Sequence, residues 1–390
     1  KMEQLGLRTE KGFAITGVKA YLNEDKKENA SLALLGELDA LRIPEHAFAN
    51  PETNAAHCCG HHAQMAGVFG AALALTVPEK LDGQVVFFAT PAEEYGEIEF
   101  KNQLREQGKI RYGGGKCELL RIGAFDDIDL CLTHHIRPGN EILVGSGTGN
   151  GFVSKVIRVL GKASHAAGAP EKGVNALSAA SLGLQALGLN RETFRDEDCV
   201  RVHPIITKGG NLVNVIPDEV VVETLVRGKT SEAFTDAAKK TDRSFKAGAI
   251  AMGAKVEIST LPGYLPTLAE EALPELKHAA EISASGIPVI EASGHAGGST
   301  DVGDVQHLMP VYTFNTGGVK GGLHQIDFEV TDEEEAYIVT AKMFALAAYG
   351  LLKEKAQRSR ELVDQYEPVF KNSAEYVEFM EQFDSKEIFE

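Results

Sequence analysis

Long hydrophobic runs are missing from the sequence, although hydrophobic residues make up 43% of its 390 residues. No apolar stretch approaches the roughly 20 residues that a helix needs to cross a bilayer. The first residues, Lys1 to Gln4, also lack the apolar core of a secretory signal peptide. We therefore expect a cytoplasmic protein with no membrane partner.

Clusters of lysine and arginine are missing as well. The 39 basic and 56 acidic residues give a formal net charge of −17 at pH 7. A surface of this charge would repel phosphate backbones and anionic lipids. We therefore expect no nucleic-acid partner, and the acidity is equally compatible with an ordinary cytosolic enzyme.

Cysteine is scarce, with five residues in the whole chain. The number is odd, and the spacing does not match that of a small disulfide-bonded domain. A reducing compartment fits this usage best, and it leaves the thiols free for other roles.

The length favours two domains, because 390 residues exceed what one compact core usually supports. The glycine-rich stretch from Gly145 to Gly151 marks a boundary, and a second change follows Leu261-Pro262-Gly263. We expect a discontinuous catalytic domain over residues 1–148 and 263–390. Residues 149–262 would form an inserted domain.

Short apolar runs in the first domain read as buried strands, at 31–35, 85–89, 129–132 and 311–314. Met65 to Leu75 is rich in alanine, glycine and leucine and predicts a tightly packed helix. A capping box at Thr331 and Glu334 predicts a closing helix with apolar residues from Ile338 to Leu352. The charged segment 353–390 would be surface helix or tail. The fold class is α/β, with a mixed central sheet flanked by helices.

The inserted segment shows a different order of elements. Strands are expected at 153–160, 200–207, 219–225 and 255–259, with helices at 173–186 and 231–252. This order is β-α-β-β-α-β, which predicts a ferredoxin-like domain.

The densest chemical signal is the segment from His57 to His62, with five metal-capable side chains in six positions. Thiolate and imidazole are good ligands for zinc-like ions. An isolated cysteine or histidine is more often structural, but buried structural residues rarely cluster in this way.

Three other signals follow predicted strands. Glu93 and Glu94 come after the strand at 85–89, His134 and His135 after 129–132, and His324 after 311–314. The carboxyl ends of strands are where open α/β sheets place ligands. One carboxylate could bind metal while its neighbour accepts a proton. Each group alone would more often be structural, but together they would converge on one sheet edge.

Other conspicuous segments are less informative. Gly113 to Lys116 lacks the spacing of a phosphate-binding loop, and we expect a flexible loop there. Ser299 to Asp301 lacks the surroundings of a nucleophilic serine and is assigned to site architecture. His165, Asn214 and Arg227 are equally compatible with a loop, a turn and a surface position.

In these residues the chain resembles the M20 metallopeptidases, specifically the amidohydrolase branch of aminoacylases, hippurate hydrolase and auxin-conjugate hydrolases. The similarity extends from about Leu34 to Leu352. It rests on motifs in the following order: Gly36 to Leu41, His57 to His61, Pro91 to Glu94, His135 three before Pro138, Ser164-His165-Ala166, Asn214 to Asp218, and His324.

The resemblance implies two divalent metal ions per subunit, of zinc, manganese, cobalt or nickel. The implied metal ligands are Cys59, His61, Glu94, His135 and His324, with Glu93 as general base. The inserted domain would be a lid and dimerisation domain in a homodimer or dimer-based oligomer. His165 would reach the neighbouring subunit's site and stabilise the oxyanion, while Asn214 and Arg227 would hold the substrate.

Two departures bear on this reading. His62 and Gln64 stand where relatives usually have aspartate and histidine, so His62 could itself bind metal. Gly298 to Asp304 is more similar to aminobenzoyl-glutamate hydrolases than to the auxin-conjugate type. The implied activity is hydrolysis of the amide bond of an N-acyl or N-aroyl amino acid. A dipeptidase or aminopeptidase of the same family and a catalytically silent metal-binding protein are the alternatives.

Overall fold

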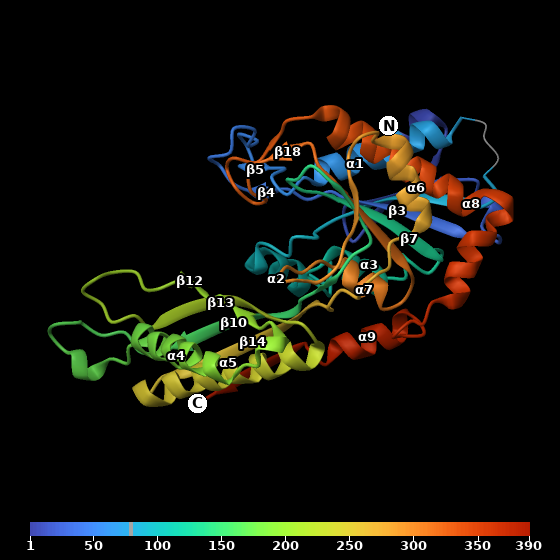
Figure 1. Cartoon of the computed structure of the whole chain (residues 1–390). Helices are drawn as coiled ribbons and strands as arrows, with labels where there is room; N and C mark the ends of the chain where they lie inside the picture. The colour runs from blue at the N-terminus through green and yellow to red at the C-terminus, as the bar shows by residue number, and fades with distance from the viewer. Residues whose placement is uncertain (78–80) are drawn as a thin grey trace. The chain divides into compact units, whose positions relative to one another are not determined.

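The computed structural model describes residues 1–77 and 81–390 (Figure 1). The chain divides into two compact units. The first comprises Lys1–Thr148, Leu268–His295 and Asp301–Glu375, and the second comprises Gly149–Thr267, Ala296–Thr300 and Tyr376–Glu390. The second unit therefore begins within the glycine-rich stretch.

The first unit contains an eight-stranded mixed sheet in the order β1-β2-β6-β3-β7-β17-β8-β15. Strand β3 is parallel to β6 and β7, and β7 is parallel to β17, whereas β2 is antiparallel to β6 and β8 to β17. The strands are β1 (Arg8–Phe13), β2 (Gly17–Leu22), β3 (Ser31–Glu37), β6 (Gln84–Thr90), β7 (Leu130–Ile136), β8 (Ile142–Val144), β15 (Val289–Glu291) and β17 (Val311–Thr316). The four predicted strands and the mixed sheet are confirmed.

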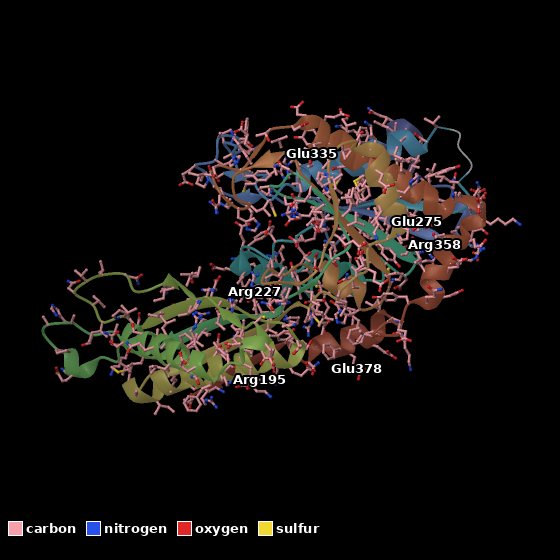
Figure 2. The ribbon with its side chains drawn as sticks, in the orientation of Figure 1. Arg195, Arg227, Glu275, Glu335, Arg358 and Glu378 are labelled. Atoms are coloured by element: carbon pink, nitrogen blue, oxygen red, sulfur yellow. The ribbon has the colours of Figure 1, made fainter. Side chains whose placement is uncertain are left out.

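Helices α1 (His61–Leu75), α6 (Pro274–Ser283) and α8 (Thr340–Gln365) share the hydrophobic core of this sheet, and α8 is preceded by the π-helical turn η6 (Glu334–Val339). The first unit also contains α2 (Ile98–Glu106), α3 (Gly115–Arg121) and α7 (Val302–Gln306). Helix α1 packs closely on α8. A Cβ atom at Gly67 of α1 would come within 2.4 Å of the Thr340 side chain of α8, so there is no space for a larger residue. Arg358 of α8 donates to Glu275 of α6 at 3.0 Å, and both are labelled in Figure 2.

The closing helix differs in detail from its prediction. The carboxylate of Asp332 accepts the backbone N–H of Glu335 at 3.1 Å, so Asp332 rather than Thr331 caps the first turn. The π-helical turn shifts the register, and Ile338 is exposed instead of buried. The stretch Glu334–Gln365 is long and apolar enough to cross a membrane, but 61% of its apolar window is buried. A core helix passes the same test, so this is weak evidence for a membrane segment.

The second unit contains an antiparallel sheet in the order β11-β13-β10-β14-β20, with β12 paired to β13. Its strands are β10 (Gly151–Leu160), β11 (Arg201–Val202), β12 (Ile205–Lys208), β13 (Glu219–Gly228), β14 (Lys255–Tyr264) and β20 (Ser385–Phe389). Helices α4 (Ala176–Asn190) and α5 (Ser231–Met252) pack on one core with β10, β13 and β14. The elements from β10 to β14 follow the expected β-α-β-β-α-β order.

Two predictions for this unit are corrected. The strand expected at 200–207 is split into β11 and β12 at His203 and Pro204, because proline has no N–H to donate to a neighbouring strand. The sequence predicts that the chain end belongs to the first domain, but β20 pairs with β14, and residues 376–390 belong to the second unit. This end contains part of α9 (Ser373–Glu381) and a strand rather than a loose tail.

Candidate metal centre

One edge of the first unit's sheet gathers most of the candidate ligands. Strands β3, β6 and β7 are parallel neighbours, so their carboxyl ends meet there. Glu37 is the last residue of β3, Glu93 and Glu94 follow β6, and His135 is the penultimate residue of β7. The structure therefore brings these strand-end groups together, as expected from the sequence.

The start of helix α1 adds Cys59 and His61 to this edge. Gly60 lies between them with a left-handed φ of 90°, and a Cβ there would come within 2.1 Å of the Ile136 side chain. Glycine is therefore required where the chain turns into the helix. His61 opens α1, and both Cys59 and His61 are buried.

Three groups of side chains could each hold a metal ion: Cys59, His61 and His135; Cys59, Glu94 and His324; and Glu37, His61 and Glu93. Within each group the ligand atoms lie within 4.8 Å of one another. The Cys59 Sγ lies 3.4 Å from His135 Nε2 and 3.2 Å from His324 Nε2. Sulfur and nitrogen bound to one tetrahedral zinc ion would be roughly 3.5 Å apart. The spacing around this thiol therefore fits a shared metal ligand.

His324 reaches the centre from a loop with unusual backbone geometry. Its φ is 64°, in the left-handed region that non-glycine residues seldom adopt. The backbone N–H of His324 donates to the carbonyl of Cys58 at 2.9 Å, and its Nε2 lies 3.1 Å from the Glu94 carboxylate. The loop is thus anchored directly beside the cysteine.

His61 has a buried nitrogen that lacks a hydrogen bond. Its Nδ1 lies 3.1 Å from the carbonyl oxygen of Asp39, which fixes the ring. Its Nε2 lies 3.2 Å from Glu37 and 3.8 Å from Glu93, yet it makes no hydrogen bond within the described residues. This nitrogen is buried, faces two carboxylates and forms no hydrogen bond with them. Such an arrangement suits a bound cation between the imidazole and the carboxylates.

The pKa shifts in the candidate metal centre are also consistent with a bound cation. Burial, together with the Glu94 and Glu93 carboxylates, raises the pKa of the Cys59 thiol. Burial, with Glu37 and Asp301 nearby, raises the pKa of Glu93 well above its usual value. Burial and His61 lower the pKa of His135, which favours the neutral imidazole that binds metals. A bound cation would relieve the cost of ionising the thiol and the carboxylates.

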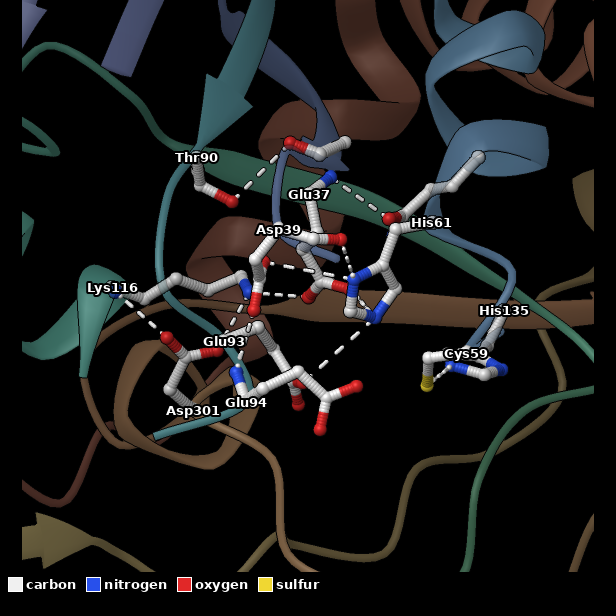
Figure 3. A network of polar contacts seen from close by, with 12 residues as sticks. Glu37, Asp39, Cys59, His61, Thr90, Glu93, Glu94, Lys116, His135 and Asp301 are labelled. Atoms are coloured by element: carbon white, nitrogen blue, oxygen red, sulfur yellow. Dashed lines mark hydrogen bonds and ion pairs between the residues drawn. The ribbon is translucent and has the colours of Figure 1, made fainter. Parts of the chain in front are cut away.

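A buried ion network behind the ligands was not expected from the sequence. Figure 3 shows Lys116 between Glu37 and Asp301, with its ammonium bonded to Glu37 and 2.6 Å from the Asp301 carboxylate. The backbone N–H of Lys116 also donates to Asp301 at 2.8 Å. The expected flexible loop at Gly113 to Lys116 is therefore wrong, because Lys116 belongs to α3 and is fully buried.

The network also explains two sequence motifs. Burial opposes ionisation of Glu37, but Lys116 and His61 lower its pKa to about 2. Glu37 therefore remains a carboxylate next to His61. Asp301, assigned to site architecture, holds Lys116. Glu37 and Asp39 lie in the Gly36 to Leu41 motif of the family resemblance, which assigns them no role.

The remaining predicted residues lie elsewhere or outside the three groups. His62 packs against the rings of His57 and Tyr337, at 5.6 and 5.9 Å between centroids, and belongs to none of the groups found in the described residues. His165, Asn214 and Arg227 lie in the second unit.

Two of these second-unit residues come from adjoining loops. His165 is exposed, and its Nδ1 accepts the backbone N–H groups of Ala167 and Gly168 at 3.2 and 3.0 Å. The N–H of Ala166 donates to the Asn214 carbonyl at 3.0 Å, which places the two segments side by side. Arg227 lies on β13, with its guanidinium 5.7 Å from the centre of the Phe152 ring.

The chain is similar in sequence to proteins that are named for different activities. An Xaa-Arg dipeptidase from Homo sapiens is 28% identical over 312 residues, which cover 76% of this chain and 66% of the dipeptidase. The chain thus spans just under two thirds of that relative. An N-acetylcysteine deacetylase from Bacillus subtilis is 27% identical over 354 residues, covering 87% of this chain and 86% of the deacetylase.

Solved structures show the same fold. The crystal structure of a dinuclear metal-binding M20 peptidase from Bacillus subtilis matches with a TM-score of 0.60 and 23% identity, covering 90% of each chain. The sequence profile of the family described as peptidase family M20/M25/M40 matches residues 33–349, which is most of the chain and includes every candidate ligand. This chain therefore belongs to peptidase family M20/M25/M40.

Proposed function

We propose that this chain is a metal-dependent hydrolase that cleaves the amide bond of an N-acyl or N-aroyl amino acid or a related conjugate. The observation that carries the proposal is Glu93, a buried carboxyl group 3.8 Å from a candidate metal ligand, His61. A purely structural metal site has no need of an adjacent base. Family membership supports the same reaction class.

Cys59, His61, Glu94, His135 and His324 would hold two divalent ions, of zinc, manganese, cobalt or nickel. Bound there, such ions supply electrophilic assistance to an amide carbonyl and increase the acidity of water. Glu93 accepts the proton of the attacking water and delivers it to the leaving amine. Burial raises the pKa of this carboxyl group, which favours its holding the accepted proton until the amine leaves.

The second unit would serve the substrate. Arg227 offers forked donors that match a carboxylate, and Asn214 lies in a loop beside that of His165. Carrying over the family resemblance, we propose that the protein forms a homodimer in the cytoplasm. His165 of one subunit would then stabilise the oxyanion in the site of the other, with the second unit as lid and dimerisation domain.

A dipeptidase activity is the second candidate. It is favoured by the relative named Xaa-Arg dipeptidase, which is 28% identical. A dipeptide carries a free amino group, so its site needs an acidic group to receive that amine, whereas an N-acyl amino acid does not. A catalytically silent metal-binding protein would hydrolyse neither.

The test is turnover of a panel of N-acyl amino acids and matched free dipeptides by the full chain. The protein is supplied with each of the four metals in turn, and Glu93→Gln serves as the inactive control. Hydrolysis of N-acyl amino acids at a higher kcat/KM than of dipeptides supports the proposal. Preference for dipeptides would support the second candidate, and no turnover of either class would overturn both.

A further inference from the structure

The segment from Tyr95 to Tyr112 leaves the site edge and returns to the place where it began. The N–H of Gly115 donates to the Ala92 carbonyl at 3.1 Å, and a Cβ at Gly115 would come within 1.5 Å of the Pro91 oxygen. Gly113 lies against the Tyr95 ring, where a Cβ would come within 2.7 Å. The segment is therefore a closed loop, which we call the α2 loop because it contains helix α2.

The α2 loop forms one wall of a cavity of about 540 Å³ in the first unit. The opposite walls come from the β1–β2 turn at 14–16 and from the stretch at 38–42 that follows β3. The lining is largely apolar, and its main apolar side chains are Ile15, Leu38, Leu41, Phe100, Leu104 and Ile110. A cavity of this size and character suits a small organic molecule.

The cavity borders the candidate metal centre. Asp39 and Glu94 line it, so a molecule in the cavity would lie directly beside one of the proposed ligands. Two apolar side chains of its lining are exposed, Ile15 at 48% and Phe100 at 54%. Ile15 also has a φ of 79°, which is strained for a β-branched residue and is the kind of cost found at binding sites.

Among the charged residues that line the cavity, Lys101 is a half-buried cation for which no ion pair is found in the described parts of the chain. Arg42 pairs with Glu97 at 3.6 Å, Asp39 accepts the N–H of Glu94 at 2.8 Å, and Glu118 pairs with Arg121. By contrast, the Lys101 ammonium sits 4.9 Å from the centre of the Tyr95 ring, and the Asp39, Asp301 and Glu93 carboxylates stabilise its charge.

Lys101 is set apart from the other lysine of the lining. Lys109 is exposed, whereas Lys101 is half-buried, and burial lowers the pKa of Lys101 to about 8 although the Asp39, Asp301 and Glu93 carboxylates oppose this shift. A lysine with this pKa still carries its charge at neutral pH. An ammonium placed against apolar walls and not ion-paired gains from an anion that enters the same cavity and bonds to it directly.

We propose that the cavity under the α2 loop binds an apolar monocarboxylate, whose carboxylate pairs with Lys101 while its hydrocarbon part packs between Leu38, Phe100 and Leu104. The carboxylate could belong to the substrate or product of the adjoining centre, or to a separate effector. The first source rests on the proposed function, whereas the binding itself does not.

The experiment measures binding of 4-phenylbutyrate to the metal-loaded full chain by calorimetry, with the uncharged 4-phenylbutanamide as the matched ligand. Wild type is compared with Lys101→Met and with Lys109→Met, which removes the exposed lysine of the same cavity. We expect the carboxylate to bind more tightly than the amide. Lys101→Met should weaken carboxylate binding at least about tenfold, and Lys109→Met by less than about threefold.

Absence of carboxylate binding to the wild type would overturn the proposal, and so would equal affinity of wild type and Lys101→Met. The second result would mean that the carboxylate binds elsewhere, for example at the metals. Thermal unfolding of both variants controls for folding. Competition with an N-acyl amino acid, in Glu93→Gln to prevent turnover, then separates the sources, because displacement identifies a substrate carboxylate. The binding result stands even if hydrolysis is never observed, so the two proposals fail separately.

Discussion

Replacing Lys116 with methionine should destabilise the first unit more than any surface charge change. Methionine fills a similar volume but leaves two carboxylates, those of Glu37 and Asp301, without their shared cation. The lysine and Asp301 side chains are 0% exposed and that of Glu37 is 3% exposed. Water therefore cannot replace the lost ammonium.

The magnitude follows from this burial. Removing one member of a buried ion pair costs about 3–5 kcal/mol, because the remaining charge stays desolvated. Two carboxylates are stranded here, and one can recover part of the cost by taking up a proton. We therefore expect Lys116→Met to lose about 3–5 kcal/mol of unfolding free energy. Adding Asp301→Asn to Lys116→Met should restore part of that loss, since one stranded charge is removed.

Urea unfolding followed by circular dichroism measures the change. The matched control is Lys342→Met, which removes the lysine paired with Glu334 at 3.1 Å on the surface, where the side chains are 49% and 66% exposed. Exposed pairs contribute about 0–1 kcal/mol, so the control should barely change stability. A Lys116→Met variant no less stable than Lys342→Met would refute the reasoning that this network is held by charge.

Three further predictions concern the centre and the proposed dimer. Glu93→Gln should keep its fold and metal content but lower kcat by at least ~10², because it removes the proton acceptor without removing a proposed ligand; near-normal turnover would exclude Glu93 as the base. Cys59→Ala should lose both activity and metal, measured by elemental analysis after dialysis, and full metal occupancy would show that the thiol is not a ligand. Mixing inactive His165→Ala with inactive Glu93→Gln should restore activity on subunit exchange, because one site of the mixed dimer is intact. No recovery after verified exchange would contradict a shared site.

The polar residues that follow the buried strands could be predicted from the sequence, because the pattern that identifies them lies within a few consecutive residues. Each apolar run and the polar group that follows it are adjacent in the chain, and parallel strands bring such groups to one edge. This rule predicts that Glu93 and His135 lie together, whereas the segment containing Cys59 is recognised by its density of metal-capable side chains. The length of the chain and the glycine-rich stretch from Gly145 to Gly151 predict two domains, and the pattern of apolar residues after that stretch predicts the order of elements in the inserted segment.

Long-range pairings were not predictable in this way. Lys116 lies 79 residues from Glu37 and 185 from Asp301, and no periodicity links the three. A lysine after three glycines indicates an exposed loop when read locally, and only the fold brings it between two acids. Strand β20 was missed for a similar reason, since Ser385 to Phe389 becomes a strand by pairing with β14, more than 100 residues earlier in sequence.

The closed geometry of the α2 loop has a consequence for how this enzyme scaffold can evolve. The chain on either side of the loop is in contact at Pro91, Ala92 and Gly115, so residues can be added to or removed from the loop without moving the strands that carry the candidate metal ligands. The entropic cost of a longer loop grows only slowly with its length. The residues that line the cavity can therefore change in number and kind while the residues of the candidate metal centre keep their positions.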